Sequence, residues 1–263
     1  MEILVCVKRV PDTSENEIAL NDSGNDIERD DLVYSVNEWD NYAVEEALQI
    51  VEKQGGNVTV ATVGGEDDEE ILRREMAMGA KKSVLISDDA FVGSDGAGIA
   101  TLLKAFVLQN KFDLILTGAQ AEDGAAQVGG MLAAMLDYPF ASLVNSIEVV
   151  GGSKLKVSRE VESGNKEMNE MDLPCVLSIQ TGINEPRYVG MRGIRQVASI
   201  AIPTLGAAEL GVDAASVGKF AAKVQRTDYF APALGKGSEM LTGSREEVID
   251  KVIELVKAKG GLK

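Results

Sequence analysis

The 263-residue sequence contains no histidine. Histidine is the commonest general base and the commonest metal ligand, so its absence removes the Ser-His and Cys-His catalytic pairs and argues against hydrolysis. Cysteine is scarce too: Cys6 and Cys175 lie far apart, and neither belongs to a CxxC motif. We therefore expect no metal site, no disulfide framework and no catalytic residues, and the two isolated thiols are typical of a reducing cytosol.

Basic residues are in deficit, since 26 Lys and Arg against 42 Asp and Glu give a formal net charge of −16. Such a field repels nucleic acid and anionic membrane surfaces. Long apolar runs are also lacking: residues 131–136 form one of the longest, far short of the roughly 20 residues of a membrane helix. The first ten residues have no signal-peptide pattern. We expect a cytoplasmic protein with protein partners, no nucleic acid and no direct membrane insertion.

The first 140 residues alternate between β-rich runs and helical periodicity, which predicts an α/β fold with a doubly wound, mostly parallel sheet. Near-continuous apolar runs are typical of strands that are buried on both faces. The predicted strands are 3–7, 58–63, 83–86 and 114–117. The predicted helices are 37–51, 69–78, 98–110 and 127–136. In the first helix, we expect Asn37 or Asp40 to act as the N-cap, and Glu45 and Glu46 to face solvent.

After residue 140 the pattern changes to shorter strands at 142–150, 154–160 and 174–179, separated by turn residues. This spacing predicts an antiparallel meander that extends the sheet. From residue 202 onward, turn residues are frequent and apolar runs are short, until a last helix predicted at 245–257. A segment without a core of its own is either a linker to a docked helix or an arm that wraps a partner.

A candidate binding site follows from the strand order, because ligands of open parallel sheets bind beyond the carboxyl ends of the strands. The segments expected there are 7–9, 37–40, 64–65 and 117–129. Gly118 and Gly124 permit a tight turn, and a helix beginning near Gln127 directs free N–H groups and the positive end of its dipole at the same loop. Any one such loop has an ordinary structural explanation, but the convergence of four favours a nucleotide. Neither GxGxxG after the first strand nor GxxxxGK[ST] occurs, so this is no typical Rossmann or P-loop site.

Three residues near this site have two interpretations each. Lys8 and Arg9 either neutralise a phosphate or are solvated charges at a strand end. Trp39, the only tryptophan, either packs under a base or seals the first helix against the sheet.

Five segments, in order, resemble the landmarks of electron transfer flavoprotein beta subunits. They read ILVCVKRVPD, VNEWDNYAVEEAL, LRREMAMGA, DLILTGAQAEDGAAQVGGMLA and LPCVLSIQTGINEPRYVGMRGI. The resemblance covers about residues 1–200 and implies an adenine nucleotide alpha hydrolase-like form of the doubly wound fold. It implies a nucleotide-binding domain at 1–200, including a recognition loop at 184–195, and a C-terminal arm at 201–263 that wraps an alpha subunit.

The same resemblance implies an electron carrier subunit in a heterodimer, not an enzyme. FAD would lie mainly in the alpha subunit, while this subunit would bury AMP or, in electron-bifurcating members, a second FAD. Small residues at 124–126 leave room for the longer ligand, so AMP and FAD both stay open. The partners implied are flavin dehydrogenases, such as acyl-CoA dehydrogenases, and a quinone oxidoreductase or other acceptor.

By position in the family, the resemblance also implies a set of contacts. The nucleotide-binding residues would be Cys6, Asn37, Glu38, Trp39, Asp40, Val63, Gly118, Gln120, Asp123, Gly124, Gln127, Val128 and Gly129. Met191 would insert into a pocket on partner dehydrogenases, and Arg187, Arg192 and Arg195 would meet acidic partner surfaces.

A competing hypothesis is a stand-alone, stress-type adenine-nucleotide-binding protein with a related doubly wound fold. Such a protein would need neither the meander nor the arm. Related pyrophosphatase-type ligases are disfavoured, because their serine- and glycine-rich loop is replaced at 7–11 by VKRVP.

Overall fold

A computed structural model describes residues 1–121, 124, 126–233, 235 and 237–261. The chain divides into two compact units. The first comprises Met1–Ala19 and Glu28–Thr227, and the second comprises Leu20–Ile27 and Asp228–Lys263.

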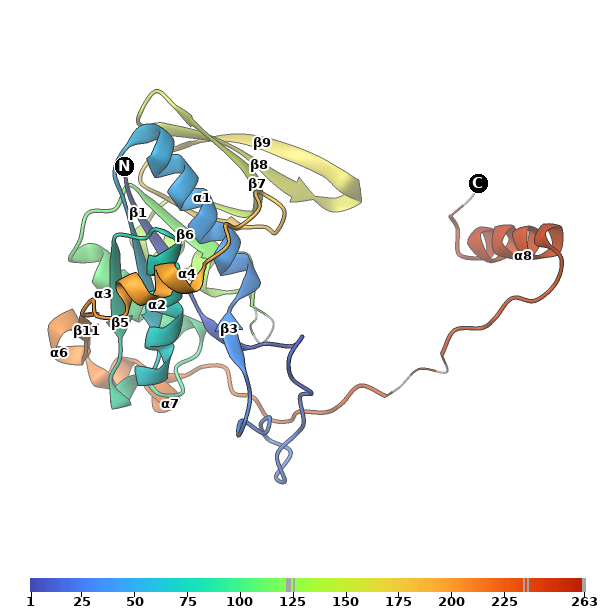
Figure 1. The fold of residues 1–263 in the computed structure, drawn as a ribbon, viewed down its shortest axis with the longest axis horizontal. Helices are drawn as coiled ribbons and strands as arrows, with labels where there is room; N and C mark the ends of the chain where they lie inside the picture. The colour runs from blue at the N-terminus through green and yellow to red at the C-terminus, as the bar shows by residue number, and fades with distance from the viewer. Residues whose placement is uncertain (122–123, 125, 234, 236, 262–263) are drawn as a thin grey trace. The chain divides into compact units, whose positions relative to one another are not determined.

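The described part of the first unit contains a nine-stranded sheet (Figure 1). Strand β1 (Glu2–Cys6) lies between β4 (Asn57–Val63) and β6 (Leu114–Gly118) and is parallel to both. Beyond β4 lies β5 (Lys82–Ile86), and beyond β6 lies β10 (Cys175–Ile179), again in parallel. The chain therefore builds outward from β1 on one side and then returns to its other side, which is the doubly wound arrangement predicted from the sequence.

Helices cover both faces of this sheet, and β1 shows why. Ile3 and Val5 belong to an apolar cluster with residues of α1 and α2, whereas Leu4 belongs to a second cluster with residues of α3 and α4. Alternate residues of a strand face opposite sides, so a central strand must be apolar throughout. The helices are α1 (Glu38–Gln54), α2 (Glu69–Met78), α3 (Gly96–Leu108) and α4 (Val128–Leu136).

Of the two N-cap candidates of α1, Asn37 occupies the N-cap position, although its side chain makes no cap hydrogen bond, and Asp40 lies inside the helix, in its first turn. The expectation that Glu45 and Glu46 face solvent was wrong. Glu45 and Glu46 are buried, with 4% and 8% of their surface exposed, because residues near 184–187 cover this part of the helix.

The predicted antiparallel meander is present, but its third strand was misassigned. It consists of β7 (Phe140–Val150), β8 (Lys154–Val161) and β9 (Asn165–Asp172). The predicted strand at 174–179 forms as β10, which lies parallel between β6 and β7. All five residues of β10 are buried, which suits the interior of a sheet, whereas the polar β9 occupies its edge.

The first unit extends past residue 200, where the sequence placed the start of the arm. Strand β11 (Thr204–Leu205) pairs with β5, and Leu210 and Val217 are buried in the core. The remaining elements of the unit are the β2 (Arg9–Pro11) and β3 (Tyr34–Val36) pair, helices α5 (Met191–Val197), α6 (Ala207–Leu210) and α7 (Gly218–Ala221), and the 3-10 turns Glu66–Asp68, Asp89–Phe91, Glu162–Gly164 and Ala214–Ser216.

The second unit contains helix α8 (Arg245–Ala258). A capping box begins it: the Ser244 hydroxyl accepts from the Glu247 N–H, and the Glu247 carboxylate accepts from the Ser244 N–H. Ile249, Val252 and Val256 recur at helical spacing, and all three are exposed. None of the helices within the described residues has the length and apolar character required to cross a bilayer.

Candidate functional site

The carboxyl ends of β1 and β6 meet under the first turn of α1, and Asp40 ties them together. One carboxylate oxygen of Asp40 accepts from the N–H of Lys8 at 2.9 Å, two residues after the end of β1. The other accepts from the N–H of Gly118 at 2.8 Å, at the end of β6. Because both oxygens are used in this way, Asp40 holds together the segments that end β1 and β6.

Two ionisable side chains lie deep in this region. Burial raises the pKa of Asp40 to about 7, against hydrogen bonds from Gly118, Asn37 and Lys8 that lower it. Burial, with a smaller contribution from the negative charge of Asp40, raises the pKa of Cys6 to about 12. The Cys6 thiol is therefore neutral at physiological pH, which does not suit a nucleophile.

Asn37, at the start of α1, contacts the loop after β6. Its Nδ2 donates to the carbonyl of Gln120 at 2.8 Å, which holds the loop after β6 against the start of α1. Asn37 is only 1% exposed, and its Oδ1 has no hydrogen-bond partner among the described residues. A buried acceptor without a donor carries a substantial energetic cost, so a ligand N–H or O–H that reaches it would be bound favourably.

The N-terminus of α4 lies next to the end of β6. Among the described residues no side chain caps this helix, so none of them supplies the usual partner for the N–H groups of its first turn. Gly129 lets the first turn approach the sheet, because a Cβ there would lie 2.7 Å from the Thr117 hydroxyl oxygen and 2.5 Å from that of Ser178. The two hydroxyl groups are themselves hydrogen-bonded at 2.9 Å. An uncapped helix N-terminus above a loop of small residues is a favourable place for a phosphate.

The other predicted nucleotide-binding residues that the structure describes lie in the first turn of α1, at the end of β4, at the start of α4 and in the loop before it. Glu38 is exposed in the first turn of α1, and Val63 ends β4. Gln127 precedes α4, Val128 begins it, and Gly124 is exposed in the preceding loop. Asp123 lies outside the described residues.

The sequence analysis missed Gln180. Its side-chain oxygen accepts from the Trp39 indole N–H at 3.3 Å, so it orients the tryptophan at the start of α1. Gln180 directly follows β10. Had 174–179 been assigned as a parallel strand, the rule that ligands bind beyond the carboxyl ends would have pointed to Gln180 as well.

The four predicted partner-binding residues fall into two groups. Met191 is 67% exposed at the first position of α5, and Arg192 and Arg195 are exposed on the same helix. Arg187 is instead engaged within the protein, since it forms ion pairs of 2.8 Å with both Glu45 and Glu52 of α1.

A doubly wound sheet with loops that meet beyond the carboxyl ends of its central strands is typical of the nucleotide-binding class of α/β proteins. Comparison with known proteins narrows this class. Residues 25–210 match the model of the electron transfer flavoprotein domain. The chain belongs to the electron transfer flavoprotein family.

Similar proteins support this assignment along nearly the whole chain. The beta subunit of electron transfer flavoprotein from Methylophilus methylotrophus is 33% identical over 260 residues, covering 97% of this chain and 98% of the relative. Subunit CarD of the caffeyl-CoA reductase-Etf complex from Acetobacterium woodii is 36% identical over 98% of this chain and 99% of the relative. Protein FixA from Azotobacter vinelandii is 37% identical over 72% of this chain and 68% of the relative.

The resemblance to beta subunits and the electron transfer role are thereby confirmed, and the stand-alone nucleotide-binding alternative is not favoured. The chain is an electron carrier subunit in a flavin-containing complex, and beta subunits of this family pair with an alpha subunit.

Proposed function

We propose that this subunit holds an adenine nucleotide in the crevice between α1 and α4. The proposal is carried by two complementary features, one at the start of α4 and one at the start of α1. Among the described residues no side chain caps the N-terminus of α4, which offers N–H donors for a phosphate, and the buried Asn37 Oδ1 has no donor there. Gly118 lets the first turn of α1 pack against the end of β6, since a Cβ there would lie 2.6 Å from that of Trp39.

The proposed occupant is AMP or a second FAD. Asn37 and the first turn of α4 would hold it, while Asp40 keeps the loops after β1 and β6 in place. A bound flavin supplies the electron transfer chemistry, and the protein contributes position and electrostatics. We propose that no residue of this chain acts as a catalytic acid or base.

The nucleotide is identified by co-expressing the chain with its alpha subunit, denaturing the purified complex and analysing the released nucleotides by chromatography and mass spectrometry. One FAD and one AMP per heterodimer would assign AMP to this subunit. Two FAD molecules and no AMP would place a second flavin here and favour electron bifurcation. A complex that releases one FAD and nothing else would refute the proposed site.

We further propose that the recognition loop docks on flavin dehydrogenases, with Met191 as the apolar anchor. A flexible, polarizable side chain that is 67% exposed suits insertion into a partner pocket. Replacing Met191 by Ala is expected to weaken electron transfer from a reduced acyl-CoA dehydrogenase about tenfold, as loss of one buried interface side chain typically does. Because Met191 is exposed, the unfolding midpoint should not change, and unchanged transfer kinetics would contradict the proposed docking role.

The second unit is proposed to wrap the alpha subunit through α8. Its exposed Ile249, Val252 and Val256 form an apolar stripe that suits burial on another chain. A quinone oxidoreductase or other acceptor is the proposed electron sink. A cytosolic location is also proposed, supported by the free thiols of Cys6 and Cys175.

A further inference from the structure

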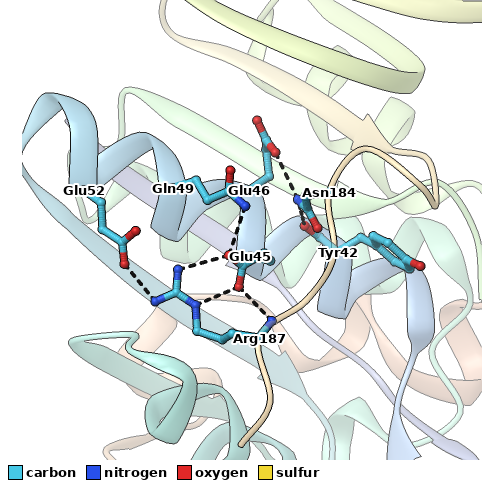
Figure 2. A network of polar contacts seen from close by, with 7 residues as sticks. All are labelled: Tyr42, Glu45, Glu46, Gln49, Glu52, Asn184 and Arg187. Atoms are coloured by element: carbon cyan, nitrogen blue, oxygen red, sulfur yellow. Dashed lines mark hydrogen bonds and ion pairs between the residues drawn. The ribbon is translucent and has the colours of Figure 1, made fainter.

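The recognition loop is fastened to α1 where it begins. The side-chain amide of Asn184 donates to the carbonyl of Tyr42 at 3.1 Å and to the carboxylate of Glu46 at 3.0 Å (Figure 2). These contacts join residues about 140 positions apart in the sequence. The chain therefore runs along α1 before it reaches the exposed part of the loop.

Arg187 makes the strongest contacts of this attachment. Its Nε and Nη2 donate to the two oxygens of Glu45 at 2.8 and 3.0 Å, and its backbone N–H donates to Glu45 at 3.1 Å. Its third guanidinium nitrogen, Nη1, donates to Glu52 at 2.8 Å. Figure 2 shows the guanidinium between these two carboxylates. Two parallel hydrogen bonds from one guanidinium to one carboxylate fix the orientation of the two side chains and also pair their charges.

The pKa shifts of Glu45 and Arg187 agree with an ion pair that forms part of the folded structure. Glu45 is 4% exposed, and burial alone would raise its pKa, but the hydrogen bonds from Arg187 and Gln49 outweigh burial and lower it. The pKa of Arg187 is raised by its hydrogen bonds to Glu45 and Glu52. The hydrogen bonds from Arg187 and Gln49 therefore favour the ionised form of Glu45 against the effect of burial.

A second arginine fastens the other end of the loop. Arg73 of α2 donates from one nitrogen to the carbonyls of Val197, Ala198 and Ile200 at 3.2, 3.1 and 3.0 Å. These carbonyls lie at the C-terminal end of α5, where a cation is favourable. The same side chain is paired with Glu69 at 2.8 Å.

Between the two attachments, large apolar side chains project into solvent. Tyr188 is 92% exposed and directly follows Arg187, and Met191 is 67% exposed. Exposed side chains of this size are not held by packing of their own. Their position therefore depends on the backbone to which they are attached.

We propose that Arg187 is a positioning residue: its fork on Glu45 holds the recognition loop in the conformation that presents Met191 to a partner. This inference rests on the proposed docking role of the loop, and it reassigns Arg187 from a partner contact to an internal anchor. Without the anchor, only a fraction of molecules presents the loop correctly. The apparent affinity for the partner falls in proportion to that fraction.

The first test is hydrogen exchange of residues 188–197 in the purified heterodimer. Arg187→Ala is expected to raise exchange in this segment about tenfold while the sheet strands keep their protection. Glu45→Gln, which leaves Arg187 in place, should act in the same direction. Glu52→Gln should have a smaller effect, because Glu52 is 56% exposed and solvent weakens its pair. Unchanged exchange in both Arg187→Ala and Glu45→Gln would overturn the inference.

A matched control is Arg159→Ala. Arg159 lies in β8, its side chain is 31% exposed against 33% for Arg187, and it is paired with Glu167. It is expected to leave exchange of residues 188–197 unchanged. Arg187→Lys keeps the positive charge but cannot make the two parallel hydrogen bonds to Glu45. Residues 188–197 should therefore keep only part of their protection against hydrogen exchange. Full recovery by lysine would show that charge alone suffices and would contradict the positioning role of the fork.

The second test is kinetic, with a substrate-reduced acyl-CoA dehydrogenase as electron donor. Arg187→Ala is expected to raise KM about tenfold and to change kcat less than twofold, because a loosened loop impairs docking but not transfer after docking. In combination with Met191→Ala, the two effects should not multiply, since Arg187 acts through the residue that is already lost. Fully multiplicative effects would overturn the inference. An effect of Arg187→Ala on exchange, together with no effect of Met191→Ala on KM, would support the anchor while refuting the docking role of Met191.

Discussion

Glu75 is a buried carboxyl group that has no hydrogen-bond partner among the described residues, so its ionisation should affect stability measurably. It lies on α2 with 0% of its surface exposed, and among the described residues neither carboxylate oxygen accepts a hydrogen bond. The nearest cation is the Arg74 guanidinium, 4.0 Å away and 47% exposed. Burial raises the pKa of Glu75 to about 8; Arg74 lowers it and the negative charge of Asp40 raises it further.

The raised pKa of Glu75 determines whether the free energy of unfolding rises or falls with pH. In the unfolded chain Glu75 loses its proton near its ordinary pKa of 4.5, whereas in the folded chain it keeps the proton up to about pH 8. Between these values the folded state binds one more proton, so the free energy of unfolding falls as pH rises. The stabilisation that comes from the extra proton on Glu75 is complete below the unfolded pKa and is lost as pH rises through the folded pKa. The slope is about 1.4 kcal/mol per pH unit.

Glu75→Gln keeps the shape of the side chain and removes this titration. Relative to wild type, the variant should gain about 2.5 kcal/mol between about pH 5.5 and about pH 7.5. Urea unfolding of the full-length chain, followed by the fluorescence of the single tryptophan Trp39, measures the difference. Asp40, with its own raised pKa, titrates in both proteins, so its contribution cancels in the comparison except for its charge coupling to Glu75.

The control is Glu70→Gln, on the exposed side of the same helix. It should follow the wild-type curve within about 0.5 kcal/mol at every pH, because a surface substitution of this kind has little effect. If the curves of wild type and Glu75→Gln run parallel across this range, Glu75 is charged in the folded state and the reasoning from burial is refuted.

Three further predictions concern the crevice and the arm. Gly118→Ala should destabilise the chain by about 1–3 kcal/mol in urea unfolding, because the added Cβ would collide with Asp40 Oδ1 and with Trp39, and it should lower the nucleotide content of the purified heterodimer. Asp40→Asn should lower the free energy of unfolding by a similar amount, about 1–3 kcal/mol, since an amide has one acceptor oxygen whereas Lys8 and Gly118 each supply a donor. A variant as stable as wild type would contradict the role of Asp40 in joining the two segments. Ile249→Asp combined with Val252→Asp should abolish co-purification with the alpha subunit while leaving the melting of the first unit unchanged, as measured by circular dichroism; retained pairing would contradict the role of α8.

The buried elements of the fold were predictable from the sequence because their composition is imposed by burial. The strands β1, β4, β5 and β6 must be apolar on both faces, and each was predicted within about two residues of its bounds. Strand β9 was not predicted, because an edge strand is stabilised by its neighbour and needs no apolar pattern of its own. Because β9 was not predicted, the segment that forms β10 was wrongly assigned as the third strand of the meander. The residues that follow β10, among them Gln180, were then not placed at the crevice.

In the candidate site, too, some features could be predicted from nearby sequence, whereas others depend on residues that are remote in the chain. Glycines at 118 and 129 and the helix start near 127 are local signals, and the structure places Gly118 against the first turn of α1 and Gly129 in the first turn of α4, against Thr117 and Ser178. The role of a charged residue depends on its partner, and the partner is often remote. Glu45 and Glu75 illustrate this, since both are glutamates on amphipathic helices and both are buried.

Their protonation differs because only one of them receives a partner from elsewhere in the chain. Arg187, which is 142 positions away, supplies three hydrogen bonds to Glu45 and lowers its pKa, whereas Glu75 accepts none within the described residues and has a raised pKa. Hydrophobic periodicity places both side chains on helices but carries no information about which one meets an arginine. For this reason the sequence could name Arg187 as a basic residue of the recognition loop, while only the structure assigns its charge to the interior of the subunit.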